Sequence, residues 1–107
     1  MASRVTSFLD SAFALQIGKF YPEYHQANLK SLREEFPEYD TELVDCLYRY
    51  SILLGECASE HAEKIYHRYQ TEQGALDILE VSFKQFSKGT REWALENALS
   101  VYSDSKN

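Results

Sequence analysis

Cys57 and His61 come closest to a chemical site in this sequence. They are four residues apart in a region of helical periodicity, so both could occupy two corners of a metal site. A metal would need further ligands, and Glu60 is displaced by about 100° around the helix. The di-metal signature, a glutamate three residues before a histidine, is absent, as is the zincin H-E-x-x-H motif. We therefore expect hydrogen-bonded core histidines at His61 and His25, and a metal-binding or enzymatic bundle using Cys57 and His61 stays the alternative.

Nucleophilic catalysis has no better candidate. Neither Cys46 nor Cys57 lies at a predicted helix N-terminus, where its pKa would fall, and no nucleophile elbow or phosphate-binding glycine loop is present. The two cysteines are about 16 Å apart along one helix, beyond the ~7 Å that a disulfide allows. Free thiols are typical of a reducing compartment. The sequence thus predicts no catalytic residue, no metal, no cofactor and a cytoplasmic location.

Tyrosine and arginine recur together at 48–50 (Tyr-Arg-Tyr) and 66–69 (Tyr-His-Arg-Tyr). Tyr48 and Tyr66 are eighteen residues, or five helical turns, apart and should project in the same direction. These residue types dominate protein-binding hot spots and also suit stacking on single-stranded nucleic acid. The net charge of −6 disfavours nucleic acid. Half-buried tyrosines flanking the core are the alternative interpretation.

A block of acids lies around Pro37, where residues 21–45 hold seven acids and two bases. Its members are Glu34, Glu35, Glu38, Asp40, Glu42 and Asp45. Such a block repels phosphates and anionic lipids and suits a basic protein surface, although a solvated helix end gives the same pattern.

The expected function is a protein-binding domain (an adaptor, inhibitor or immunity-type protein) whose partner has a basic surface. Neither nucleic acid nor a membrane is an expected partner, and a purely structural homo-oligomer is the third possibility. We expect one continuous site in which acids steer the partner and Tyr48 and Arg49 hold it. The expected contact residues are Glu38, Glu42, Asp45, Tyr48, Arg49, Tyr66 and Arg68.

Helices must position these residues, because the chain shows helical periodicity throughout and no strand alternation. We expect a single all-α domain over 1–107, a bundle of four to five helices organised around one long central helix at about 40–70. The other helices are expected at 4–17, about 22–36, about 75–89 (closed by Gly89) and from a cap at Thr90. The ends, 1–3 and 103–107, should fray.

The central helix should begin after Pro37 with Asp40 as its N-cap. Its expected apolar face is Leu43, Leu47, Tyr50, Leu54, Cys57, His61 and Ile65. A stripe of small residues beside it, Ser51, Gly55, Ala58 and Ala62, would let a neighbouring helix approach closely. The opposite charges at Asp45 and Arg49, and at Glu60 and Lys64, have the i,i+4 spacing of ion pairs.

Two boundaries stay open: the helix could break near Gly55–Ser59, and 71–74 could be a loop or helical. The helix would be about 45 Å long against about 22 Å for its neighbours. Either the two flanking pairs of helices each cover one half, or a second chain covers part of it. This mismatch predicts a homodimer.

Membrane insertion and secretion are not expected. No apolar run exceeds four residues. The segment Met1–Ile17 contains Asp10 and lacks a basic n-region, so a secretory signal is not predicted.

Leu32–Leu47 reads L-x-x-x-F-P-x-Y-x-x-x-L-V-x-x-L. It resembles the first helix and the start of the second helix of ubiquitin-binding CUE domains, whose motif is Met-Phe-Pro. Glu35 stands here in place of the methionine, and the long helix that follows differs from a compact three-helix CUE module. The resemblance implies that Phe36 and Pro37 belong to a contact surface, although a Phe-Pro pair ending any amphipathic helix has the same pattern.

Overall fold

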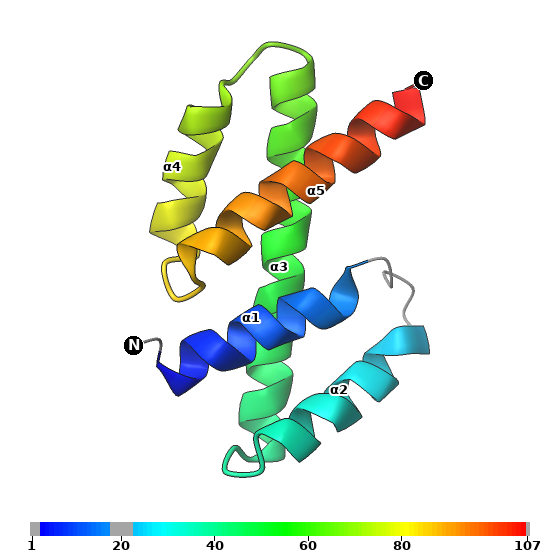
Figure 1. Ribbon diagram of the computed structural model, residues 1–107, viewed down its shortest axis with the longest axis vertical. Coiled ribbons are helices and arrows are strands. Elements are labelled where there is room, and N and C mark those ends of the chain that lie inside the picture. Colours follow the sequence, from blue (N-terminus) through cyan, green and yellow to red (C-terminus); the bar gives the residue numbers. More distant parts are fainter. Residues whose placement is uncertain (1–2, 18–22, 107) are drawn as a thin grey trace. The chain divides into compact units, whose positions relative to one another are not determined.

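The computed structural model describes residues 3–17 and 23–106, with side chains up to 103, and contains five helices and no strand in these ranges (Figure 1). The helices are α1 (Arg4–Gln16), α2 (Glu23–Glu35), α3 (Thr41–Tyr66), α4 (Glu72–Ser82) and α5 (Lys88–Lys106). The predicted all-α class and the long helix at its centre are confirmed. Pro22, expected in the first turn of the second helix, lies outside the described residues.

The chain divides into two compact units, 1–52 and 53–107, so the division lies inside α3. Unit 1 holds α1, α2 and the first part of α3, and unit 2 holds the rest of α3 with α4 and α5. The helix is continuous through Gly55–Ser59, so the break that the sequence left open there does not occur.

Buried positions occur in both parts of α3. Val44, Tyr48 and Ser51 are buried in unit 1, and Leu54 and Ala58 are buried in unit 2. A single chain therefore buries this helix along its length, with one pair of shorter helices in each unit. The homodimer stays a prediction, but the length mismatch no longer supports it.

Side-chain caps begin two helices of unit 1, and one of them, the cap of α3, was predicted. Ser3 accepts a hydrogen bond from the backbone of Thr6 and caps α1. The Oδ1 atom of Asp40 accepts one from the backbone N–H of Leu43 at 2.8 Å, which confirms the predicted cap of α3. Figure 1 shows α1 and α2 side by side and running in opposite directions, as a short connection favours.

The core of unit 1 joins all three of its helices. Phe8 and Phe36 meet edge to face with ring centroids 5.0 Å apart. The buried cluster comprises Phe8, Ala12, Leu32, Phe36, Val44 and Tyr48. The apolar face predicted for α3 is displaced, because Val44 is fully buried whereas Leu43 is 39% exposed. The buried face of α3 instead includes three of the four small residues, Ser51, Ala58 and Ala62.

In unit 2, α3 ends at Tyr66 and not near Gln70 as expected. The N–H of Arg68 bonds to the carbonyl of Ile65, and the N–H of Tyr69 bonds to that of Lys64 at 2.8 Å. Arg68 has φ 66°. These bonds and this left-handed residue form a Schellman motif, which terminates a helix.

The open boundary at 71–74 is a helix start. Thr71 caps α4, and its Oγ1 accepts a hydrogen bond from the N–H of Gly74 at 3.0 Å. A Cβ atom at position 74 would meet that same oxygen at 3.1 Å, so glycine leaves room for the cap. Residues 72–74 are therefore helical.

The boundary between α4 and α5 differs from the prediction. Helix α4 ends at Ser82, and Ser87 caps α5 by accepting a hydrogen bond from the N–H of Thr90. Gly89 and Thr90 thus lie within the first turn of α5. The Arg91 guanidinium donates to the carbonyl of Phe86 and holds the connecting loop. Helix α5 continues to Lys106, and the fraying expected at the ends of the chain stays a prediction.

Within the described ranges, no helix has both the length and the apolar content required to cross a membrane.

Candidate binding surfaces

Two of the predicted acidic contact residues form ion pairs inside unit 1. Glu38 bonds to Arg4 at 2.7 Å, and Asp45 meets Arg33 at 3.4 Å in place of the expected Arg49. The hydrogen bond from Arg4 lowers the pKa of Glu38, against the smaller opposing effect of desolvation. Both pairs are exposed, so they contribute little to folding, but each pair neutralises a carboxylate that a basic partner would otherwise use.

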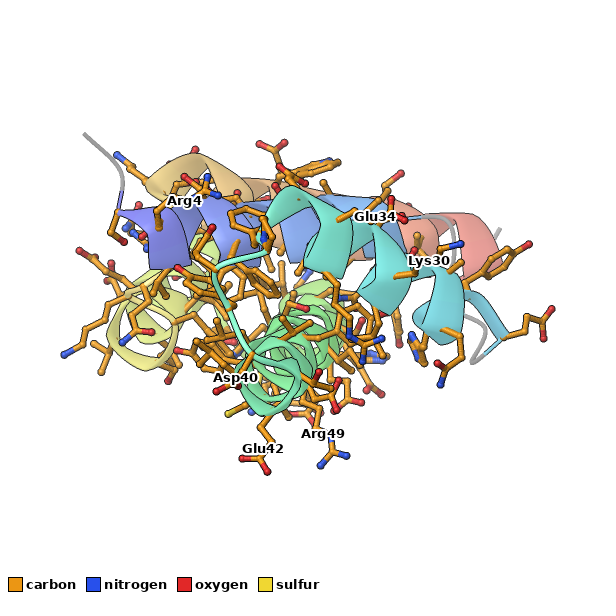
Figure 2. All side chains as sticks on the ribbon, turned by 90° about the horizontal axis from the view of Figure 1, so that it is seen from below. Arg4, Lys30, Glu34, Asp40, Glu42 and Arg49 are labelled. Atoms are coloured by element: carbon orange, nitrogen blue, oxygen red, sulfur yellow. The ribbon has the colours of Figure 1, made fainter. Side chains whose placement is uncertain are left out.

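Glu42 and Arg49 are the other charged contact residues predicted in unit 1. Both are exposed, and neither has an ion-pair partner in the described part of the chain. Figure 2 shows Glu42 and Arg49 projecting from α3, whereas Glu34 and Lys30 lie on α2 and away from them. The acidic block therefore does not form one face.

Tyr48 is not a surface residue, which corrects the prediction that it holds a partner. Its side chain is 3% exposed. Its hydroxyl accepts a hydrogen bond from Asn28 Nδ2 at 3.1 Å and lies 2.5 Å from Nδ1 of His25. Burial raises the pKa of Tyr48, and the bond from Asn28 opposes this effect. The continuous site expected around Tyr48 and Arg49 is therefore not formed.

A second buried polar contact links α1 to α3 in unit 1. Gln16 donates from Nε2 to Ser51 Oγ at 2.5 Å, and Ser51 donates to the carbonyl of Tyr48 at 2.6 Å. This contact was not predicted from the sequence. One signal was available: Gln16 follows Ala12 and Phe13 at helical spacing and so shares their apolar face.

The end of α3 carries exposed aromatic side chains in unit 2. Tyr66 is 48% exposed and Tyr69 is 83% exposed. Tyr66 packs on Tyr102 with ring centroids 5.0 Å apart, and Nε2 of His67 lies 3.1 Å from the Tyr102 hydroxyl. Arg68 is exposed beside them. The structure thus places the two contact residues predicted here, Tyr66 and Arg68, at one exposed turn, together with Tyr69.

A shallow pocket of about 320 Å³ lies on the last turns of α3. It is lined by Glu60, Glu63, Lys64, His67 and Tyr69. The expected ion pair between Glu60 and Lys64 is not formed, and neither glutamate has an ion-pair partner among the described residues. This pocket was not predicted, because its aromatic wall follows the end of the helix and falls outside helical periodicity.

A second pocket of about 330 Å³ lies between α4 and α5. Most of its polar side chains have partners within unit 2. Gln73 bonds to Asp77 at 2.8 Å, and Lys88 lies 3.8 Å from Glu92. Arg91 bonds to loop carbonyls. These contacts leave fewer groups for a ligand than the pocket on α3.

Cys57 and His61 do not form part of a metal cluster in the described residues, where no group of three or more His, Cys, Asp or Glu side chains is close enough to hold a metal ion. Nδ1 of His61 lies 2.7 Å from Gln70 Oε1, which confirms a hydrogen-bonded histidine. Burial, followed by the charges of Glu60 and Glu56, raises the pKa of Cys57. Both cysteines are free thiols.

Phe36 is 1% exposed and packs in the core of unit 1, so the contact surface implied by the CUE resemblance is wrong at this residue.

Comparison with protein-family models found no match, and comparisons with curated proteins and with solved structures found none either.

Proposed function

We propose that this chain is a protein-binding module, of the adaptor, inhibitor or immunity type, that recognises a basic surface on its partner. The contact centres on Tyr66, Arg68 and Tyr69 at the end of α3. The observation that carries the proposal is the exposure of Tyr69, 83%, beside a second tyrosine that is 48% exposed.

Large aromatic side chains have much apolar area and few rotatable bonds, so burying them under a partner contributes strongly to the binding free energy. Arginine has the same enrichment in binding hot spots, and Arg68 lies between the two tyrosines in the chain. The neighbouring carboxylates of Glu60 and Glu63 favour a partner that presents positive charge there.

The preference for a basic partner also agrees with the net charge of −6. Long-range attraction of this kind speeds association and weakens as salt is added. Glu42 on unit 1 can contribute to this attraction because it is exposed and unpaired within the described chain.

Affinity capture from the native host with matched variants tests the proposal. Tyr69→Ala and Arg68→Ala should each reduce recovery of the captured partner, and Tyr69→Ala should weaken its affinity by about tenfold or more if Tyr69 is a hot spot. The controls are Tyr24→Ala and Arg49→Ala, which remove the same residue types from unit 1 and should retain the partner.

Binding is then measured with purified partner at two salt concentrations. Stronger binding at low salt supports a basic partner surface. The proposal fails if the unit 1 variants lose the partner while the two unit 2 variants, shown to be folded by circular dichroism, keep it. It also fails if the affinity is independent of salt.

A further inference from the structure

The pocket on the last turns of α3 is formed by side chains of one helix face and by one residue of the turn that follows the helix. Glu60, Glu63, Lys64 and His67 have spacings of three, one and three residues, which places them on one face of the helix. Tyr69 stands at the edge of this face. Its position follows from the helix end, because its N–H bonds to the carbonyl of Lys64 at 2.8 Å.

The charge of the pocket favours a cation. Two carboxylates and one ammonium line it, and neither glutamate has an ion-pair partner in the described residues. The pocket also lies at the negative end of the α3 dipole. Consistent with this potential, Glu60 contributes to the raised pKa of Cys57.

The aromatic wall distinguishes between cations. Tyr69 is 83% exposed, and the centroid of its ring lies 6.4 Å from the centroid of the His67 ring. Nε2 of His67 is directed to Tyr102. A planar cation can stack on the tyrosine while it donates hydrogen bonds to carboxylates. A guanidinium group satisfies both conditions, whereas an ammonium is a compact and strongly hydrated point charge that lacks a face to stack.

We infer that this pocket accepts the side chain of an arginine from the partner protein. The guanidinium stacks on Tyr69 and donates hydrogen bonds to Glu60 and Glu63. Lys64 opposes this binding, because it places a positive charge at the same site. The inference rests on the proposed function for the source of the arginine, but the pocket can be tested without the partner.

The test is a titration of the ¹⁵N-labelled full chain with an acetylated and amidated Gly-Arg-Gly peptide, followed by heteronuclear NMR. The same peptide with citrulline is the control for charge, since citrulline has nearly the shape of arginine and is neutral. A lysine peptide is the control for the planar group. Amide shifts are expected over 60–69, with weaker binding of lysine and no saturable binding of citrulline.

Variants separate the two contributions. Glu63→Gln should weaken arginine binding about two- to fivefold, and Tyr69→Leu by a similar factor. Lys64→Gln should strengthen it about two- to fivefold, which a general loss of structure would not do. Glu96→Gln makes the same charge change at another exposed position of unit 2 and should leave the affinity unchanged.

The inference is overturned if citrulline binds as well as arginine, if the shifts fall outside 60–69, or if Lys64→Gln does not strengthen binding. If the arginine peptide does not bind but partner binding still depends on Tyr69, the arginine site is refuted and the proposed function stands. If the peptide binds but partner binding does not depend on Tyr69, the arginine site stands and the proposed function is refuted.

Discussion

Tyr48→Phe should destabilise unit 1, although it removes a single oxygen atom. In the wild type, the Tyr48 hydroxyl accepts a hydrogen bond from Asn28, which is 4% exposed. The hydrogen of this hydroxyl can be donated to Nδ1 of His25. Without the hydroxyl, a buried amide donor has no partner, which costs about 1–3 kcal/mol. His25 is only half-buried, so water can replace its lost bond at smaller cost.

The free energy of unfolding is measured by urea denaturation at neutral pH. Tyr69→Phe is the matched control, because the same atom is removed from a ring that is 83% exposed, and its effect should stay within about 0.5 kcal/mol. In an Asn28→Ala background the cost of Tyr48→Phe should fall, since the orphaned donor is gone. The reasoning is refuted if Tyr48→Phe stays within about 0.5 kcal/mol of the wild type, or if its cost is the same in both backgrounds.

The alkaline limit of stability tests the same site. Burial raises the pKa of Tyr48, so the folded state holds the phenol proton more tightly than the unfolded state does. This contribution is fully present below the ordinary tyrosine pKa of about 10 and is lost as pH rises through the raised value. Tyr48→Phe should therefore reduce the loss of stability at high pH in urea titrations. An unchanged alkaline slope would contradict this assignment.

Three further changes have expected outcomes in unit 2 and at the thiols. Arg68→Gly should stabilise the fold by up to about 1 kcal/mol, because glycine adopts the observed φ of 66° without steric cost; a loss of stability in thermal denaturation would contradict the Schellman assignment. Leu54→Ala should cost about 2–5 kcal/mol, since Leu54 is fully buried, and a change below about 0.5 kcal/mol would show that it is not a core residue. Iodoacetamide should modify the exposed Cys46 before Cys57, whose pKa is raised; mass spectrometry over time decides, and faster labelling of Cys57 would reverse the prediction.

The helical class and the N-cap of α3 were predictable from the sequence, because they depend on residues that are neighbours along the chain. Phe8, Leu9 and Phe13 share one face by spacing alone, and all are buried. Asp40 caps α3 through a bond to a residue three positions away. The connection before α5 was less readable, because Ser87 and Thr90 are both good N-caps and only packing of the loop over 83–87 selects Ser87.

The phase of α3 and the accessibility of its tyrosines were decided by the tertiary structure. Apolar residues occupy adjacent positions on this helix, so periodicity gives the spacing of the buried face but does not choose between Leu43 and Val44. That choice also decides whether Tyr48 faces a partner or the core, and it is made by His25 and Asn28 of α2, which bind its hydroxyl from 20 or more positions away. Composition can indicate that tyrosines are candidate contact residues. Which of these tyrosines is exposed to solvent depends on the packing of distant segments, because burial is set by neighbours that sequence spacing does not specify.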